Sequence, residues 1–571
     1  MVRPVRPVHW AIALGAAQLM NAPATLDTIE ATLKPLARDE VIRTCVRMIN
    51  AMALDRQLRE SQDPLVAWLP IEARLRYRQF RRDDADVRLF HPFQQLMLIH
   101  AAARFSTGDG THCSSEEKMQ RWALASIQIN DHIGKAAPPD GLSRPDKAMF
   151  LISEEVARWE LMNPSNPNRS LGRLRAMLVD EVPYAGQSEA EAAERLRNRF
   201  GERLRLSFTT AFNLAAFLVY WWRVQTAHAP TNLDAATIEL PKWLKDSSIS
   251  VEDQRSFLFK VSMETDEVGP LFEPLGGMSL HQLIPFRRRP LLRIDRDHFA
   301  FICPQFVVEK GGVDLLWLSA HEPGGPKEDR PWQDDFGLLY ERYIRLILER
   351  LGDRLGGRFL PDIHWADNED QGQIDGLIHS YHSLFIVETK ASLLRQHILN
   401  TGTVDEVRKD IEAKFVGNAL DQKGVAQLLR AVAWLARERQ RNNTVCGIDL
   451  RKISEVIPIL VVADRAMRFP PVALWLNHRM QVLRSERQIK SPGALRSLIV
   501  CGTEDIENLE QLALQGERRP TEVIGEFARD VTRVGEALWQ QYNAPHDPHP
   551  RLNAIFDRWL GELSREGVLP S

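Results

Sequence analysis

The chain has 571 residues and a formal net charge of −3, with 44% hydrophobic and 26% charged residues. This length predicts more than one domain, and the composition excludes disordered and fibrous proteins. The nearly balanced charge argues against a protein that coats nucleic acid over its whole surface. The five cysteines have no metal-ligand spacing, which argues against a zinc knuckle or a disulfide framework and fits a cytoplasmic location.

Residues 1–230 are helical by pattern, and we expect them to form one helical domain for recognition or assembly. The apolar stretch His9–Met20 resembles a signal peptide, but its Gly and Gln interruptions favour an amphipathic helix. Polar residues dilute Leu206–Trp222, which predicts a buried helix rather than a membrane span, so no membrane partner is expected. Two prolines within Asn163–Asn168 predict a break between helices.

Residues 231–330 are expected to be a mixed α/β connecting region. Apolar runs at Leu291–Ile294, Phe299–Ile302 and Val313–Leu318 are typical of strands. Two arginine clusters, Arg195–Arg205 and Arg287–Arg296, have the charge to follow a phosphate backbone. Acidic and apolar residues interrupt both clusters, which favours salt-bridged surface instead.

The segments Gly372–Ile378 and Leu384–Ala391 are two apolar runs around a short polar turn, which predicts a β-hairpin. Glu388 and Lys390, two apart on one strand, point to the same face, and Asp375 on the neighbouring strand can meet them. Because burying unpaired charge is costly, these side chains must pair, stay hydrated or bind a cation. Two carboxylates suit Mg²⁺, one of its waters can act as a nucleophile, and a lysine can offset charge on a phosphate. The group predicts metal-assisted phosphodiester hydrolysis.

These residues resemble the PD-(D/E)XK, or restriction-endonuclease-like, nuclease superfamily, whose members carry an Asp and then (Asp/Glu)-x-Lys on the next strand. The catalytic matches are Asp375, Glu388 and Lys390, with Asp375 and Glu388 as metal ligands. The family usually adds a Glu on the preceding helix, matched by Glu341 as a metal ligand, and often a Gln on the following helix, matched by the catalytic candidate Gln427. The resemblance implies a mixed β-sheet flanked by helices over residues 331–505, with Mg²⁺ or Mn²⁺ as the cofactor and nucleic acid, first of all DNA, as the partner.

Two features of this region leave alternatives. The literal Pro361-Asp362 pair matches the dipeptide of the family name, but we expect it to begin the connection into the hairpin and prefer Asp375. The long segment Leu393–Asp421 is expected to form an extra helix pair or a substrate-contacting insertion. Its residues Lys409 and Lys414 could meet phosphates, although a solvated helical face explains each lysine on its own.

Further apolar runs at Ile457–Ala463 and Leu498–Cys501 predict additional strands of the same domain. Residues 506–571 are expected to be a C-terminal helical segment, with a last amphipathic helix at Leu552–Leu563 that docks on the body. The chain contains no Walker-type phosphate loop, so a nucleotide-driven motor is not part of it.

The sequence therefore predicts a multi-domain α and α/β protein with a helical N-terminal domain and a nuclease-like core. We expect a metal-dependent nuclease, an endonuclease on DNA, and defence of bacteria against foreign DNA is suggested by analogy of fold alone. Two alternatives stay open. One is a catalytically inactive nuclease fold that binds nucleic acid or regulates, and the other is a helical scaffold that assembles with partner proteins or further copies of the chain.

Overall fold

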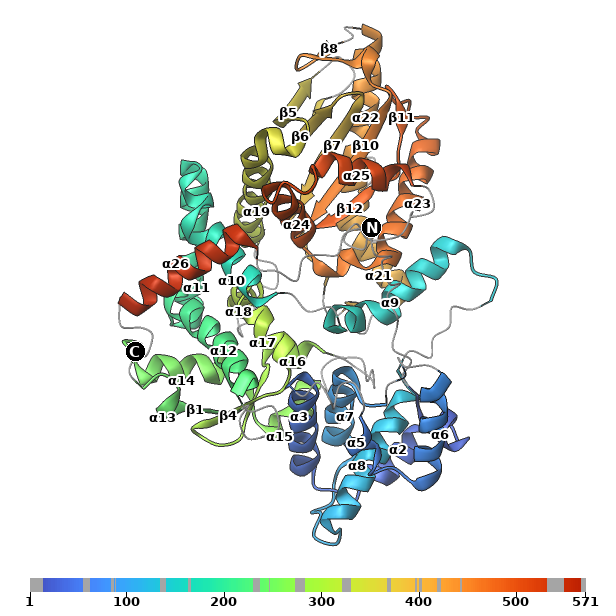
Figure 1. Cartoon of the computed structure of the whole chain (residues 1–571), viewed down its shortest axis with the longest axis vertical. Coiled ribbons are helices and arrows are strands. Elements are labelled where there is room, and N and C mark those ends of the chain that lie inside the picture. The colour runs from blue at the N-terminus through green and yellow to red at the C-terminus, as the bar shows by residue number, and fades with distance from the viewer. Residues whose placement is uncertain are drawn as a thin grey trace.

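The computed structural model shows a mixed α/β protein dominated by helices, which confirms the mixed character of the predicted fold (Figure 1). The structure describes residues 14–54, 62–83, 87, 89–133, 140–162, 166–228, 237–245, 247–272, 283–320, 330–366, 371–395, 398–399, 403–417, 423–441, 444–530 and 549–565. Within these ranges, no helix has both the length and the hydropathy that crossing a bilayer requires.

A six-stranded sheet forms the centre of the C-terminal half. Its strands are β5 (Arg358–Ala366), β6 (Gln371–Ser380), β7 (Ser383–Lys390), β10 (Glu455–Val462), β11 (Ala494–Leu495) and β12 (Ile499–Gly502). They lie in the order β11-β10-β7-β6-β5, and β12 pairs with β10. β6 runs antiparallel to both of its neighbours, β5 and β7, whereas β10 runs parallel to β7, β11 and β12. The predicted hairpin and both later strands are thus confirmed.

The connection expected at Pro361-Asp362 is wrong, because these two residues lie within β5 at the edge of the sheet. Proline lacks an N–H group, and strands accept it mainly at sheet edges and irregularities. Pro361 is therefore compatible with this edge strand, although it lowered the strand signal in the sequence.

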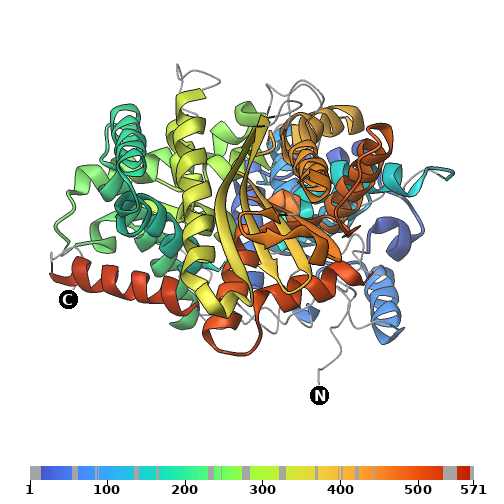
Figure 2. The same cartoon turned by 90° about the horizontal axis from the view of Figure 1, so that it is seen from above.

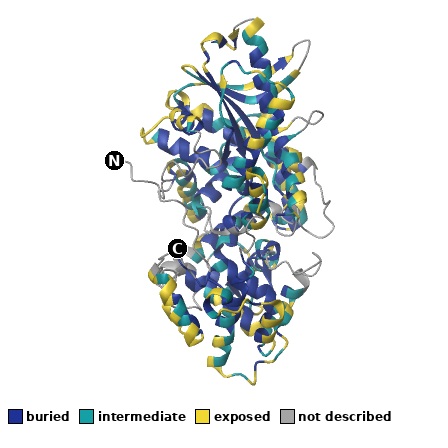
Figure 3. Ribbon diagram, turned by 90° about the vertical axis from the view of Figure 1, so that its right-hand side faces the viewer, coloured by how far each residue is buried: buried dark blue, intermediate teal, exposed yellow. Residues whose placement is uncertain are grey.

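Helices cover both faces of the sheet (Figure 2). One face packs against α19 (Arg330–Leu351), α24 (Thr503–Leu514) and α25 (Pro520–Arg529), and the other against α22 (Gly424–Arg441) and α23 (Pro470–Glu486). Along β7, Phe385 and Val387 enter the first core while Leu384 and Ile386 enter the second. A strand buried on both faces is apolar throughout, which explains the run Leu384–Val387 (Figure 3).

The described part of the segment between β7 and α22 contains less helix than the helix pair that the sequence predicted. It contains α21 (Val404–Ile411), which continues into a single π-helical turn at Glu412–Val416. Lys414 donates hydrogen bonds to the Leu393 carbonyl at 2.6 Å and to Asp410 at 2.9 Å, so its ammonium ties this segment together. Lys409 is exposed on α21, as the solvated interpretation expects.

The N-terminal helices fall into two groups. The first is α1 (Ala16–Met20), α2 (Leu26–Leu33), α3 (Arg38–Leu54), α5 (Asp63–Val66), α6 (Ile71–Asp83), α7 (Pro92–Phe105) and α8 (Ser115–Asn130), and the second is α9 (Arg144–Met162), α10 (Pro167–Arg175), α11 (Gln187–Leu204) and α12 (Phe208–His228). α12 confirms the buried helix expected at Leu206–Trp222. The expected break is also confirmed, since α9 ends at Met162 and the side chain of Asn166 caps α10.

The connecting region contains a second sheet of four strands in the order β1-β4-β3-β2. These are β1 (Thr237–Glu239), β2 (Ser262–Met263), β3 (Leu291–Arg293) and β4 (His298–Phe301), and its main helices are α14 (Val251–Lys260), α15 (Thr265–Phe272), α16 (Ile284–Arg288), α17 (Pro304–Lys310) and α18 (Asp314–Ala320). The strand expected at Val313–Leu318 is wrong, because this run lies in α18. A short apolar run does not distinguish a buried strand from a buried helix.

Several arginines of each cluster form ion pairs within the protein, as the second interpretation expects. Arg287 pairs with Glu160 of α9 at 2.7 Å, and Arg293 pairs with Glu264 at 2.5 Å. Arg195 pairs with Asp335 of α19 at 2.7 Å. The guanidinium groups of these three arginines are thus bound to carboxylates of the protein itself.

The hydrophobic cores cross the boundary expected near residue 230. Ile152, Val156 and Trp159 of α9 belong to the core under one face of the six-stranded sheet. α10, α11 and α12 share the core under the other face with α19 and α24. The first helical group, α1–α8, packs instead with residues of β3 and β4. The second helical group therefore supports the sheet directly.

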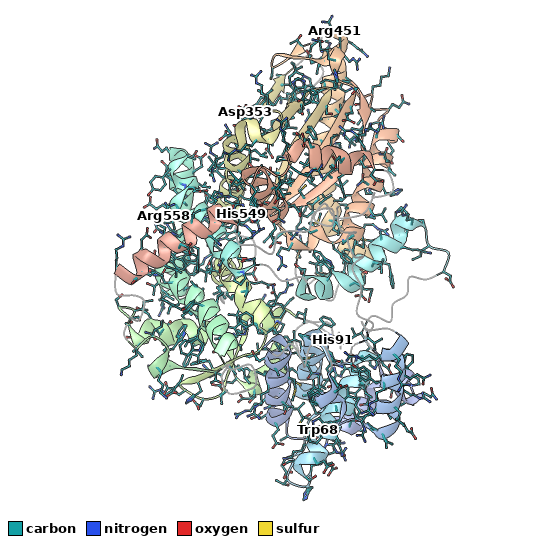
Figure 4. The ribbon with its side chains drawn as sticks, viewed as in Figure 1. Trp68, His91, Asp353, Arg451, His549 and Arg558 are labelled. Atoms are coloured by element: carbon teal, nitrogen blue, oxygen red, sulfur yellow. The ribbon has the colours of Figure 1, made fainter. Side chains whose placement is uncertain are left out.

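The last helix, α26 (Pro550–Arg565), buries Leu552, Ile555, Trp559 and Leu563, which confirms the docked amphipathic helix predicted at the C-terminus. His549, labelled in Figure 4, precedes it and is fully buried, with Nε2 3.0 Å from the Glu507 carbonyl oxygen. The linker that the prolines of Gln541–Pro550 predict lies outside the described residues, apart from His549 and Pro550.

Candidate active site

Two aspartates lie where the sheet is locally irregular. The ladder of β5 against β6 pairs Pro361 with Gly376 and Ile363 with Ile374, and it leaves Asp362 and Asp375, which lie between these pairs, unpaired in the ladder. On β6, Ile374 and Leu377 enter the same core although they are three residues apart, whereas strict alternation would place them on opposite faces. Asp362 has a φ of 48°, in the left-handed region. Such irregularities re-aim side chains next to functional sites.

Asp375 connects β6 to the end of β7. Its Oδ2 accepts a hydrogen bond from the Thr389 N–H at 2.5 Å. This bond lies just beyond the last ladder pair of β6 and β7, Gly376–Val387. The half-buried Asp375 carboxylate is thereby held beside Glu388, the residue that precedes Thr389. The predicted meeting of these two acidic residues at the strand end is confirmed.

Lys390 and Glu388 form an ion pair on one face of β7. The Lys390 Nζ atom lies 2.5 Å from Glu388 Oε1, which confirms that the two side chains share a face. Glu388 is only 1% exposed. Its second oxygen, Oε2, is buried and has no hydrogen-bond partner among the described residues.

Gln427 completes the site from α22. The Lys390 ammonium donates to Gln427 Oε1 at 3.3 Å, and Gln427 Nε2 donates to the Gln373 carbonyl at 3.0 Å. The neighbours of Gln427, from Gly424 to Leu429, are buried against the sheet, so the helix packs closely enough for this side chain to reach β6 and β7. Gln427 therefore lies on the helix that follows the hairpin, as predicted, and its side chain contacts Lys390.

Glu341 lies at the rim of the site on α19. Glu341 is exposed to solvent, but protein atoms surround much of its carboxyl group and limit its hydration. Burial, and then the charge of Asp375, raise the pKa of Glu341 to about 7, while Lys390 opposes the shift. These electrostatic effects require Glu341 to lie near both residues.

The carboxyl groups of the site have raised pKa values because the protein shields them from water. Burial is the largest cause for Glu388, followed by the charge of Asp375, and Lys390 only partly offsets them, so the pKa of Glu388 lies well above its usual range. Burial also raises the pKa of Asp375. For Lys390, burial acts to lower the pKa, but the nearby carboxylates raise it overall and keep the ammonium charged.

The donor set fits a hard divalent cation. The unpartnered oxygen of Glu388 and the carboxylate of Asp375 provide the oxygen ligands that Mg²⁺ prefers, and Mg²⁺ commonly takes only one or two protein carboxylates and keeps several waters. In the part of the chain that the structure describes, three or more His, Cys, Asp or Glu residues nowhere form a metal-binding group. Glu341, predicted as a third ligand, thus does not join Asp375 and Glu388 in such a group. A cation here would be held by Asp375 and Glu388, with Glu341 acting from the rim.

The sequence offered Asp362 only as the alternative to Asp375 and placed it in a connection, because β5 itself was not predicted. It missed Arg345 of α19, which forms an ion pair with Asp362. The available signal was helical spacing, since Arg345 follows Glu341 by four residues and lies on the same side of the helix.

Comparisons of this chain with protein-family models, with curated proteins and with solved structures found no match.

Proposed function

We propose that the protein is a metal-dependent nuclease with a restriction-endonuclease-like core. The observation that carries this proposal is the unpartnered oxygen of Glu388, which is buried beside the carboxylate of Asp375 and the ammonium of Lys390. Burying a carboxylate with an unsatisfied oxygen is costly, and proteins retain such groups mainly at functional sites. A bound cation removes this cost.

Each residue of the site has a role that follows from its contacts. Asp375 and Glu388 would hold Mg²⁺ or Mn²⁺, which when bound supplies charge neutralisation and an acidified water. Lys390 stays charged and can stabilise the negative charge that develops on a phosphate. Gln427 fixes the Lys390 ammonium, and Glu341, with its pKa of about 7, can exchange a proton near neutral pH.

The order of elements supports the same proposal. Helix α19 with Glu341 precedes the hairpin of Asp375, Glu388 and Lys390, and helix α22 with Gln427 and the parallel strand β10 follow. This is the order that the superfamily resemblance implies. We propose DNA as the substrate and bacterial defence as the context, the second on analogy of fold alone.

Nicking of a supercoiled plasmid by the purified full-length protein tests this function. We expect cleavage with Mg²⁺ or Mn²⁺ and none with EDTA. Lys390→Ala and Asp375→Asn should each lower the rate by about 10³-fold, the scale of losing a principal electrostatic group. A structured RNA run beside the plasmid identifies the preferred polymer.

Asp334→Asn is the matched control, because it also removes an exposed carboxylate from α19 but lies two helical turns before Glu341. It should cleave like the wild type. Full activity of Lys390→Ala, or activity that EDTA leaves unchanged, would overturn the proposal. Tight DNA binding without cleavage under any metal would favour the inactive nucleic-acid-binding alternative.

A further inference from the structure

Arg345 lies next to the proposed catalytic residues without being one of them. Residues four apart on a helix are neighbours on its surface, so Glu341, Arg345 and Glu349 form one stripe along α19. The Arg345 guanidinium donates to Glu349 Oε1 at 2.7 Å and forms a second ion pair with Asp362. Arg345 thus connects the helix of Glu341 to the edge strand β5.

Its partner Asp362 places the guanidinium close to the cation site. Asp362 and Asp375 lie on neighbouring strands, between the ladder pairs Pro361–Gly376 and Ile363–Ile374. Burial contributes most to the raised pKa of Glu341 and of Asp375, and the negative charge of Asp362 adds to both. An effect on both groups places Asp362, and therefore the guanidinium that it holds, at the border of the site.

The two cations beside the site differ in how firmly they are held. Lys390 is 18% exposed and pairs with a buried carboxylate. Arg345 is 29% exposed, and its partners Glu349 and Asp362 are 33% and 56% exposed. Ion pairs between accessible groups are weak and exchange readily with other anions. Among these two cations, Arg345 is the one that can change partners.

A nucleic-acid chain carries a phosphate on each side of the bond that is cut. A planar guanidinium matches a phosphate through paired hydrogen bonds. We propose that Arg345 binds a backbone phosphate next to the scissile one, and that the substrate is therefore an oligonucleotide chain rather than an isolated phosphodiester. This inference rests on the proposed nuclease function. In the free protein, Asp362 and Glu349 hold the guanidinium in position.

A comparison of two substrates tests this role. The variants Arg345→Ala and Arg345→Lys are assayed with Mn²⁺ on a duplex of about 30 base pairs and on bis(p-nitrophenyl) phosphate, which has no neighbouring phosphate. For Arg345→Ala we expect the KM for the duplex to rise about tenfold with kcat within about twofold, and the salt slope of duplex binding to fall by about one. The rate on the small diester should stay within about twofold. Arg345→Lys should recover part of the lost affinity, because it keeps the charge.

Arg354→Ala is the control, since it removes an exposed arginine just beyond the end of α19 and should leave both rates unchanged. An unchanged duplex KM in Arg345→Ala would refute the inference. Equal losses on both substrates would also refute it, because Arg345 would then only support the structure of the site. If the wild type cleaves neither substrate, the proposed function fails. Duplex binding in Ca²⁺ then still decides the role of Arg345, which an unchanged salt slope would refute.

Discussion

Glu388 and Glu455 are two buried glutamates at opposite ends of neighbouring parallel strands. Glu455 begins β10 opposite Ser383, whereas Glu388 lies near the end of β7 opposite Leu460. Glu388 is 1% exposed and Glu455 is 5% exposed, so burial does not distinguish them. Their hydrogen-bond partners do.

The Glu455 carboxylate is fully partnered. It accepts from the Ser383 hydroxyl at 2.5 Å, from Arg529 Nη2 at 2.5 Å and from Arg496 Nε at 3.0 Å. Burial alone would raise the pKa of Glu455, but these hydrogen bonds lower it to about 2. Glu388 has one cationic partner, one unsatisfied oxygen and a raised pKa. The same side chain at similar burial is therefore structural at one end of the sheet and available for a ligand at the other.

The largest effect that this comparison predicts is on catalysis by Glu388→Gln. Removing the charge should lower plasmid cleavage by about 10³-fold, because the metal loses a ligand. The fold should keep its stability or gain some, since a neutral amide of the same shape removes the cost of burying a charged group with one unsatisfied oxygen, while Lys390 keeps Gln427 and the nearby Asp375. Cleavage and the thermal midpoint are measured on the same sample. A strongly destabilised Glu388→Gln protein would show that Glu388, like Glu455, is structural.

Glu455→Gln should show the opposite pattern. It leaves two arginines next to a neutral group, and because Arg529 and Arg496 remain partly exposed we expect a loss of about 2 kcal/mol rather than the full cost of a broken buried pair. The cleavage rate per folded molecule should stay within about twofold. Chemical denaturation and a plasmid assay at low temperature measure both quantities. A large loss of kcat in a folded Glu455→Gln protein would contradict the distinction.

Local pattern was enough to predict the strand that carries Glu388. The run Leu384–Val387 followed by Glu388 and Lys390 predicted the strand and the shared face, whereas Glu341 and Gln427 were identified only through the superfamily resemblance. β5 was missed, because Pro361 and a polar stretch weakened its strand signal. Asp362 was consequently placed in a connection and not in the strand next to that of Asp375.

The partners of a buried carboxylate could not be predicted in the same way. Glu455 is satisfied by Ser383, Arg496 and Arg529, which lie 72, 41 and 74 residues away in the chain. Whether any glutamate acquires such partners depends on long-range packing that the spacing of residues does not encode. The packing of α9 against the sheet, across the boundary expected near residue 230, has the same long-range character.

Glu341 extends the comparison to the rim of the site. If Glu341 acts as an anion, cleavage should rise with pH through about 7, the pKa to which burial and Asp375 bring this group. Glu341→Gln should lower cleavage by about tenfold and flatten this part of the pH profile, since one proton-exchanging group is lost. The control Asp334→Asn should keep the wild-type profile. An unaltered profile in Glu341→Gln would show that the pH dependence comes from another group.

The smallest effect concerns stability in the presence of metal, and its sign differs between the two glutamates. Folding raises the pKa of Glu388, so the folded protein loses stability as the pH rises from about 4.3 through the folded pKa of this group. Glu455, with a lowered pKa, stabilises the fold above about pH 4.3, and this contribution is lost as the pH falls toward about 2.

A divalent cation replaces the proton on Glu388, so Mn²⁺ should raise the thermal midpoint by about 2 °C or more, and more strongly at pH 8 than at pH 6. The shift should persist in Glu455→Gln and vanish in Glu388→Gln. A shift of equal size in both variants would place the cation elsewhere in the protein and break the comparison.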